Sequence, residues 1–143
     1  MRYPTNRMKT FEQIHDFLNA VTRWASTQPD IQAVALVGSY ARNAATDSSD
    51  IDLVLLTYQP GKYLDDTEWL GQFGSVEKQQ REYYGIVTSL RVWYADGREV
   101  EYGITTPAWA ALPFDAGTQQ VIQDGMKILF ERDALLSRHI PDA

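Results

Sequence analysis

The first regular pattern along the chain is helical. From Phe11 to Ala25, apolar residues recur at every third or fourth position, which is the spacing of an amphipathic helix. Thr10 and Gln13 have the form of a capping box at the start of this pattern, and Pro29 follows its end. We therefore predict one amphipathic helix whose apolar stripe faces a core.

Two short apolar runs follow, and both predict buried strands. They are IQAVALV at residues 31–37 and IDLVLLT at residues 51–57. Gly38 ends the first run, and the polar residues 39–50 predict a connection that opens with a short helix. Further on, residues 76–84 are polar with weak alternation, which favours a strand at the edge of the sheet.

The clearest hairpin signal lies at residues 88–104. TSLRVWY and REVEYGI flank Ala95, Asp96 and Gly97, which predicts a three-residue loop with Gly97 in the left-handed conformation. The pairs expected from this loop are Val92 with Val100, Leu90 with Tyr102, Arg91 with Glu101, and Trp93 with Glu99. A two-residue turn at Asp96 and Gly97 would set apolar side chains opposite carboxylates. We therefore predict the first register, with the arginine near the carboxylates.

The remaining elements are predicted from local signals. They are a chain break at Pro60 and Gly61, a helix at about 65–73, a short helix from Pro107, a helix at 118–123, a strand at 126–130 and a terminal helix at 132–139. Together the elements predict an α/β (α+β) fold with a mixed, mostly antiparallel sheet. We expect the helices on one face of the sheet and the strand carboxylates exposed on the other.

Composition limits the domain organisation and the metal chemistry. The chain has 143 residues, 44% hydrophobic and 22% charged, and we expect a single globular domain over residues 1–143. It has no cysteine and two histidines, His15 and His139, which excludes a thiolate metal site and disfavours a histidine-rich zinc site. A metal ion must therefore bind to carboxylates.

Net charge and hydropathy indicate partners and compartment. A net charge of −6 argues against duplex nucleic acid as a partner, because phosphate binding relies on clustered Lys and Arg. The N-terminus lacks the apolar run of a signal peptide, and no segment reaches the roughly 18 apolar residues that span a bilayer. We therefore expect a cytoplasmic protein with no membrane partner.

Gly38 and Ser39 stand where the first predicted strand turns into a helix. At such a turn, free backbone N–H groups and the serine hydroxyl point at one place and can hold a phosphate. Glycine permits the close approach of the backbone. Arg42, about one helical turn later, supplies a positive charge to the same polyphosphate.

Asp50 and Asp52 stand at the entrance to the second strand. One residue separates them, so both side chains leave one face while Ile51 and Leu53 leave the other. Two converging carboxylates repel each other unless a cation lies between them. Mg²⁺ prefers oxygen ligands and is usually bound by one or two carboxylates together with substrate phosphates, so it is the expected ion.

The spacing of these two motifs resembles a known signature. A Gly-Ser pair, ten intervening residues and Asp-x-Asp before an aliphatic run are similar to the signature of the DNA polymerase β-like nucleotidyltransferases. That superfamily includes antibiotic adenylyltransferases and minimal nucleotidyltransferases that pair with small helical partners. The resemblance implies that Ser39 binds nucleotide phosphates and that Asp50 and Asp52 bind metal ions.

The resemblance also implies a third carboxylate on a neighbouring strand, as a metal ligand or as the base for the acceptor hydroxyl. Glu101 occupies the matching position, and Glu99 on the same face is the reserve candidate. The sequence departs from the usual pattern at two places. Glu101 replaces the commoner Asp, and Asn43 stands where many relatives have Gly.

These implications lead to an expected reaction. A nucleoside monophosphate, with AMP favoured, moves from Mg-NTP at a two-ion site to an acceptor hydroxyl of a small molecule or protein, and pyrophosphate leaves. The alternative is a non-catalytic, antitoxin-like or regulatory nucleotide-binding module that acts through a partner protein. Because larger relatives hold the acceptor with an added helical domain, we expect a homodimer or a separate helical partner.

Overall fold

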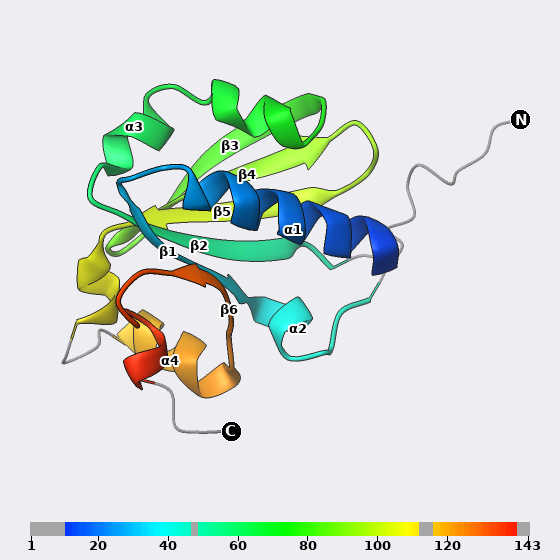
Figure 1. The fold of residues 1–143 in the computed structure, drawn as a ribbon. Helices are drawn as coiled ribbons and strands as arrows, with labels where there is room; N and C mark the ends of the chain where they lie inside the picture. Colours follow the sequence, from blue (N-terminus) through cyan, green and yellow to red (C-terminus); the bar gives the residue numbers. More distant parts are fainter. Residues whose placement is uncertain (1–10, 47–48, 112–115, 140–143) are drawn as a thin grey trace, which may run out of the picture.

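A six-stranded mixed sheet forms the centre of the molecule (Figure 1). The computed structural model describes residues 11–46, 49–111 and 116–139. The strands are β1 (Ile31–Val37), β2 (Ile51–Thr57), β3 (Val76–Tyr84), β4 (Val87–Tyr94), β5 (Glu99–Thr105) and β6 (Lys127–Glu131). Their order is β3-β4-β5-β2-β1-β6, with β2 and β5 parallel and the other neighbouring pairs antiparallel. The predicted α+β fold class is confirmed.

Helices of different lengths connect the strands. The α-helices are α1 (Phe11–Ser26), α2 (Gly38–Ala41), α3 (Pro60–Leu64) and α4 (Ala116–Asp124), and the 3₁₀ helices are η2 (Glu68–Phe73), η3 (Pro107–Ala110) and η4 (Ser137–His139). The first helix, the strands at 31–37, 51–57 and 76–84, and the short helix from Pro107 are as predicted. The proposed capping residue Thr10 lies outside the described residues.

β4 and β5 form the predicted hairpin, and all four expected residue pairs are observed. Gly97 in the loop has a φ of 99°, which favours glycine. The loop is closed by the N–H of Tyr94, which donates to the carbonyl of Arg98 at 2.9 Å. This register sets Arg91 directly opposite Glu101.

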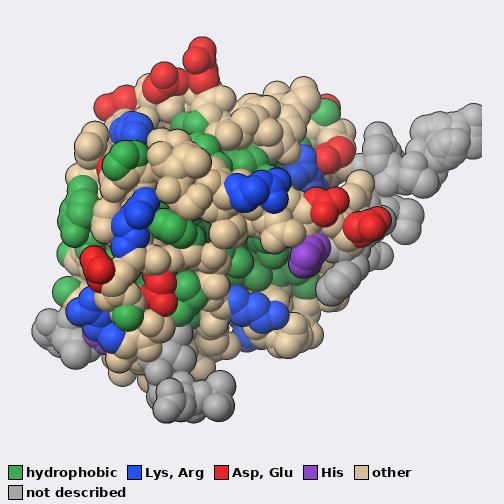
Figure 2. All heavy atoms as spheres, in the orientation of Figure 1, with side chains coloured by type: hydrophobic (Ala, Val, Ile, Leu, Met, Phe, Trp, Pro, Cys, Tyr) green, Lys and Arg blue, Asp and Glu red, His purple; other side chains and the backbone are tan. Residues whose placement is uncertain are grey.

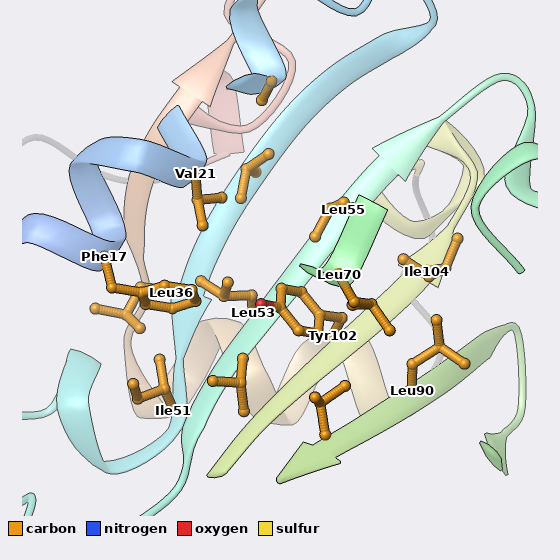
Figure 3. Packing of buried hydrophobic residues seen from close by; sticks show 14 of the residues in the cluster. Phe17, Val21, Leu36, Ile51, Leu53, Leu55, Leu70, Leu90, Tyr102 and Ile104 are labelled. Carbon is orange, nitrogen blue, oxygen red and sulfur yellow. The ribbon is translucent and has the colours of Figure 1, made fainter. Parts of the chain in front are cut away.

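The main core lies between one face of the sheet and the helices α1, α3 and η2 (Figure 3). Phe17 of α1 shares this core with Leu53 of β2 and Tyr102 of β5, and all three side chains are buried. Burying an apolar side chain of this size contributes about 1.5–3 kcal/mol. Trp24 and Trp69 stack with ring centroids 5.0 Å apart, which joins α1 to η2. The core therefore fixes the strands that carry the candidate site.

The opposite face is called the carboxylate face, because Asp52 and Glu101 lie on it. A second buried cluster on this face contains Ala33, Ala35, Val37, Val54, Leu56, Trp109, Ala110 and Leu136. Val121 of α4 packs against that cluster. The expectation that the helices pack on one face only is therefore wrong. β1 and β2 are apolar on both faces, so the second face also needs cover.

In place of the predicted helix at 65–73 the structure has a 3₁₀ helix, η2 at Glu68–Phe73, and an α-helix, α3 at Pro60–Leu64, that precedes the predicted range. The chain does not break at Pro60, because proline suits the first position of a helix and α3 begins there. The helix ends at Asp65, whose N–H donates to the carbonyl of Gly61. η2 begins at Glu68, whose N–H donates a hydrogen bond to the carboxylate of Asp66.

The terminal helix expected at 132–139 is replaced by turns that end in η4. Asp133 and Ala134 have φ values of 56° and 54°, in the left-handed region that a right-handed helix excludes. The carboxylate of Glu131 accepts the N–H groups of Leu136 at the end of the turn and of Ser137 at the start of η4, at 3.0 Å each. These hydrogen bonds stabilise a tight turn against the second cluster instead of a helix.

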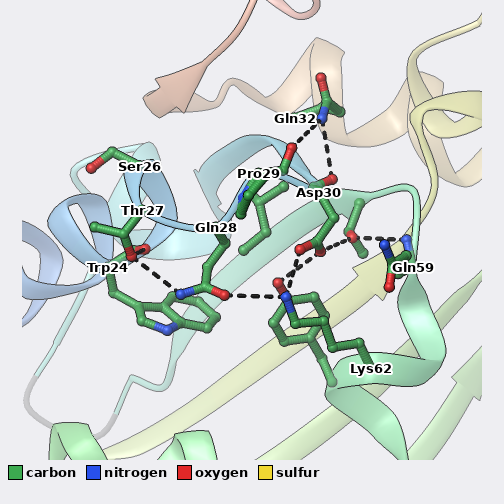
Figure 4. Close-up of polar contacts among 12 residues, drawn as sticks. Trp24, Ser26, Thr27, Gln28, Pro29, Asp30, Gln32, Gln59 and Lys62 are labelled. Atoms are coloured by element: carbon green, nitrogen blue, oxygen red, sulfur yellow. Dashed lines mark hydrogen bonds and ion pairs between the residues drawn. The ribbon is translucent and has the colours of Figure 1, made fainter.

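A buried aspartate connects the start of β1 to α3 (Figure 4). Only 5% of the Asp30 side chain is exposed. Its carboxylate accepts hydrogen bonds from the hydroxyls of Thr57 and Tyr63, at 2.6 and 2.7 Å, and pairs with Lys62 at 2.7 Å. Burial alone would raise the pKa of Asp30, but these three partners outweigh burial and lower that pKa below its ordinary value. Asp30 is therefore a charged buried group.

The surface over α1 carries charges of both signs (Figure 2). Basic and acidic side chains lie among neutral ones on this face, and they do not gather there into one patch. None of the helices in the described ranges has the length and apolar character required to cross a membrane.

Candidate active site

Three carboxylates converge on the carboxylate face. Asp52 is the register partner of Val37 in β1 and of Glu101 in the parallel strand β5. Asp50 precedes β2 by one residue. One carboxylate oxygen of each of Asp50, Asp52 and Glu101 lies within 4.8 Å of the other two. We call these residues the acidic trio, and all three are half-buried rather than exposed as expected.

Burial and mutual repulsion disfavour the charged form of the trio. Burial, with Asp50 and Glu101 close by, raises the pKa of Asp52 to about 7. Burial also raises the pKa of Glu101, although Arg91 acts in the opposite direction. A bound cation would relieve this cost, and divalent ions such as Mg²⁺ take carboxylate oxygens as ligands. The trio therefore has the donor atoms and the charge that such an ion requires.

Arg91 on β4 contacts two members of the trio and two further acids. Its guanidinium lies 3.2 Å from Asp50 and 3.0 Å from Glu101, and also 3.2 Å from Glu82 and 2.6 Å from Glu99. The predicted position of Arg91 near the site is confirmed. Glu99, the reserve candidate, pairs with Arg91 and lies outside the trio.

Glu82 is a site residue that the sequence did not reveal. It lies on β3, where its carboxylate accepts hydrogen bonds from Tyr84 at 2.6 Å and Gln80 at 2.7 Å. The available signal was the alternation of Gln80, Glu82 and Tyr84, which places these three side chains on one face of the edge strand. Residues 76–84 are polar on both faces of the strand, so the alternation did not single out Glu82.

The predicted phosphate turn lies beside the trio. Gly38 and Ser39 begin α2 immediately after Val37, the residue that pairs with Asp52. Gly38 has a φ of 73°, and a Cβ placed on it would collide with the carboxylate of Asp52. Ser39 is half-buried in the first turn of α2, and Arg42 is exposed at its end. Because Gly38 has no side chain, the carboxylate of Asp52 can lie directly against this turn.

Asn43, the departure from the usual glycine, takes the backbone conformation that glycine would. Its φ is 58°, and asparagine is among the residues that tolerate this region best. Its side-chain oxygen accepts a hydrogen bond from Lys127 of β6 at 3.2 Å. The substitution therefore keeps the turn after α2 and connects it to the neighbouring strand.

Gly38→Ala is expected to weaken divalent-ion binding by about tenfold or more, because its methyl group would displace the Asp52 carboxylate. The left-handed backbone at this position adds about 1 kcal/mol of destabilisation. Mn²⁺ titration calorimetry and urea unfolding measure the two effects. Gly71→Ala is the matched control, since a Cβ at Gly71 meets nothing within 4 Å. Unchanged Mn²⁺ affinity in Gly38→Ala would contradict the close approach.

A cavity of about 280 Å³ opens next to Asp52 and Glu101 on the carboxylate face. Its lining is mainly apolar and includes Val54, Val87, Gly103, Trp109, Thr118 and Val121. η3 and α4 form the wall of this cavity opposite the sheet. Sequence reasoning missed the cavity because it left this face of the sheet open. Such a space can receive a compact apolar group close to the carboxylates.

Comparison with known proteins identifies the family. Residues 8–141 match the streptomycin adenylyltransferase family. MJ0128 of Methanocaldococcus jannaschii is 37% identical over 83 residues, which are 58% of this chain and 78% of that protein. MJ0126 of the same organism is 36% identical over 53 residues, which are 37% of this chain and 54% of that protein. Both relatives are provisionally named as protein adenylyltransferases.

The fold has a counterpart among solved structures. An aminoglycoside 6-adenyltransferase from Bacillus subtilis superposes with a TM-score of 0.56 at 16% identity, over 71% of this chain and 37% of that one. This chain thus spans little more than a third of that protein. The likeness shows the nucleotidyltransferase fold that the sequence motifs predicted. With the sequence match over residues 8–141, the chain belongs to the streptomycin adenylyltransferase family, a family of nucleotidyltransferase enzymes.

Proposed function

We propose that this protein transfers a nucleoside monophosphate, with AMP favoured, from Mg-NTP to an acceptor hydroxyl and releases pyrophosphate. The observation that carries the proposal is the acidic trio, whose oxygens lie within 4.8 Å of one another beside the turn at Gly38. Family membership supports the same reaction type.

Mg²⁺ fits the trio by donor chemistry, since all three ligands offer oxygen and Gly38 lets the backbone of the turn come close to Asp52. We propose a two-ion site formed by Asp50, Asp52 and Glu101. Bound there, Mg²⁺ would supply Lewis-acid activation and neutralise the charge of the triphosphate.

The protein's own residues take distinct roles in this proposal. The backbone at Gly38 and the hydroxyl of Ser39 hold the phosphates, and Arg42 adds a positive charge. Glu101 accepts the proton of the acceptor hydroxyl, for which a raised pKa is suitable. The acceptor oxygen forms a bond to the α-phosphorus, the bond from that phosphorus to the bridging oxygen breaks, and the electron pair leaves with pyrophosphate.

The test is incubation with each α-labelled NTP, Mg²⁺ and candidate acceptors, both small aminoglycosides and proteins. Label transfer by the wild type and its loss in the double variant Asp50→Asn/Asp52→Asn are expected. Transfer that survives in the double variant would contradict the metal assignment. Nucleotide binding without transfer to any acceptor would instead identify a non-catalytic module that acts through a partner protein.

The apolar cavity beside Glu101 is proposed to receive the group that bears the acceptor hydroxyl. Val121→Phe on α4 is then expected to lower kcat/KM for the acceptor by roughly tenfold, since an added ring would fill part of the 280 Å³. Steady-state assays at saturating NTP measure this change. Ile122→Phe on the same helix, outside the cavity lining, is the control. Equal kcat/KM in both variants would place the acceptor elsewhere.

We propose that a second copy of the chain, or a separate helical protein, completes the acceptor cleft in the cytoplasm. This chain spans 37% of the aminoglycoside enzyme whose fold it shares. Sedimentation of the active protein tests this, and a strictly monomeric protein with full activity would contradict it. We also propose that residues 1–143 act as one domain and that duplex nucleic acid is not a partner.

A further inference from the structure

Arg91 divides its contacts between two kinds of carboxylate. Asp50 and Glu101, at 3.2 and 3.0 Å, belong to the acidic trio. Glu82 and Glu99, at 3.2 and 2.6 Å, lie outside it. The guanidinium therefore contacts two carboxylates that would be ligands of a metal ion. It also contacts two carboxylates that would not be ligands.

The contacts with Glu82 and Glu99 can hold Arg91 in place without the contacts to the acidic trio. The Nε and one Nη of Arg91 donate to Glu82, and the other Nη donates to Glu99. Glu82 is in turn fixed by the hydroxyl of Tyr84 and the amide of Gln80. Paired hydrogen bonds of this kind hold a guanidinium in a defined orientation.

We propose that Arg91 is a built-in counter-cation of the metal site. Without metal, it holds Asp50 and Glu101 together against their mutual repulsion. When a divalent ion binds, Arg91 gives up those oxygens and stays anchored to Glu82 and Glu99. Arg91 is thus a positioning residue that sets the affinity of the site for metal. This inference rests on the proposed metal site.

Two opposing effects of Arg91 decide the direction of the expected result. Arg91 brings the ligands together, which favours metal binding, but it also repels a divalent ion and shares its oxygens. Backbone pairing of β2 with β5 already sets Asp52 beside Glu101, and Asp50 directly precedes the first paired residue of β2, so the ordering effect is the smaller one. Removing the charge of Arg91 should therefore tighten metal binding.

The experiment measures Mn²⁺ affinity by calorimetry at constant ionic strength. Arg91→Met is expected to bind Mn²⁺ about tenfold more tightly than the wild type. Changes to groups that contact metal ligands alter metal affinity on this scale. Glu82→Gln is expected to bind it more weakly, because Arg91 then relies more on the trio. Arg81→Met, which removes an exposed charge from the same strand as Glu82, is the control and should not change the affinity.

Equal or weaker Mn²⁺ binding in Arg91→Met would overturn the inference. If that variant fails to fold, Glu82→Gln decides alone, and unchanged or tighter binding there would also overturn it. The proposed metal site has a separate criterion. If the wild type and Asp50→Asn/Asp52→Asn bind Mn²⁺ with equal affinity, the proposed metal site itself is wrong. If the double variant binds Mn²⁺ more weakly than the wild type but Arg91→Met binds it with wild-type affinity, only the proposed role of Arg91 is refuted.

Discussion

Asp52→Asn is expected to lower the rate of nucleotidyl transfer by about 10³-fold. Losing a group that stabilises charge in the transition state lowers rates on this scale. Asp52 is the register partner of both Val37, directly before Gly38, and Glu101, so an amide there removes charge from the centre of the trio. The same change relieves repulsion from Asp50 and Glu101. The metal-free variant should therefore be at least as stable as the wild type, which separates loss of activity from loss of fold.

Urea unfolding in EDTA checks the second part of this prediction. Because the folded-state pKa of Asp52 is raised to about 7, its contribution to stability is present at acid pH and is lost as pH rises towards 7. The amide introduced by Asp52→Asn does not titrate, so the stability advantage of the variant should grow between about pH 4 and pH 7. Asp16→Asn, at an exposed aspartate of α1, should change neither activity nor stability. A strongly destabilised Asp52→Asn would contradict the repulsion described here.

Asp30→Ala is expected to lower the free energy of unfolding by about 3 kcal/mol at pH 7. Two buried hydroxyls, those of Thr57 and Tyr63, would lose their acceptor. Lys62 would lose less, since 42% of its side chain is exposed and water can replace the carboxylate. Urea unfolding measures the change. Asp16→Ala, at an exposed position of α1, is the control and should cost less than about 0.5 kcal/mol.

The pH dependence of this difference distinguishes a charge effect from a packing effect. The folded-state pKa of Asp30 is lowered from its ordinary value of 3.8. Its contribution is therefore complete above about pH 4 and is lost as pH falls through the lowered folded-state value. The gap between the wild type and Asp30→Ala should narrow only below about pH 4. A gap that stays constant to about pH 2 would show that the charge of Asp30 contributes little.

The sequence predicted those features of the fold that depend on local pattern. The strands at 31–37 and 51–57 were recognisable because both are continuous apolar runs. The β4–β5 register followed from one loop and one alternation, and it correctly set Arg91 beside Glu101. The motif from Gly38 to Asp52 identified the two aspartates of the trio because spacing and strand parity are short-range properties.

Features that depend on contacts between distant segments were not predictable in the same way. The cover of the carboxylate face by Trp109 and Val121 is a tertiary arrangement. The two-sided apolar character of β1 and β2 was the only signal for it. The turn at Asp133 and Ala134 overrides a helical pattern because Glu131 binds the turn's N–H groups. Local propensity is weak against such contacts.

The parallel pairing of β2 with β5 makes the site depend on a contact between distant parts of the chain. The connection at residues 38–50 joins β1 to β2, so the pairing that brings Asp52 to Val37 is close in sequence. Glu101 reaches Asp52 only when β5 docks on β2 across the long interval that contains β3 and β4, which is a slow, non-local step. The acidic trio thus combines a contact that closes a short loop, between β1 and β2, with one that closes a much longer loop, between β2 and β5.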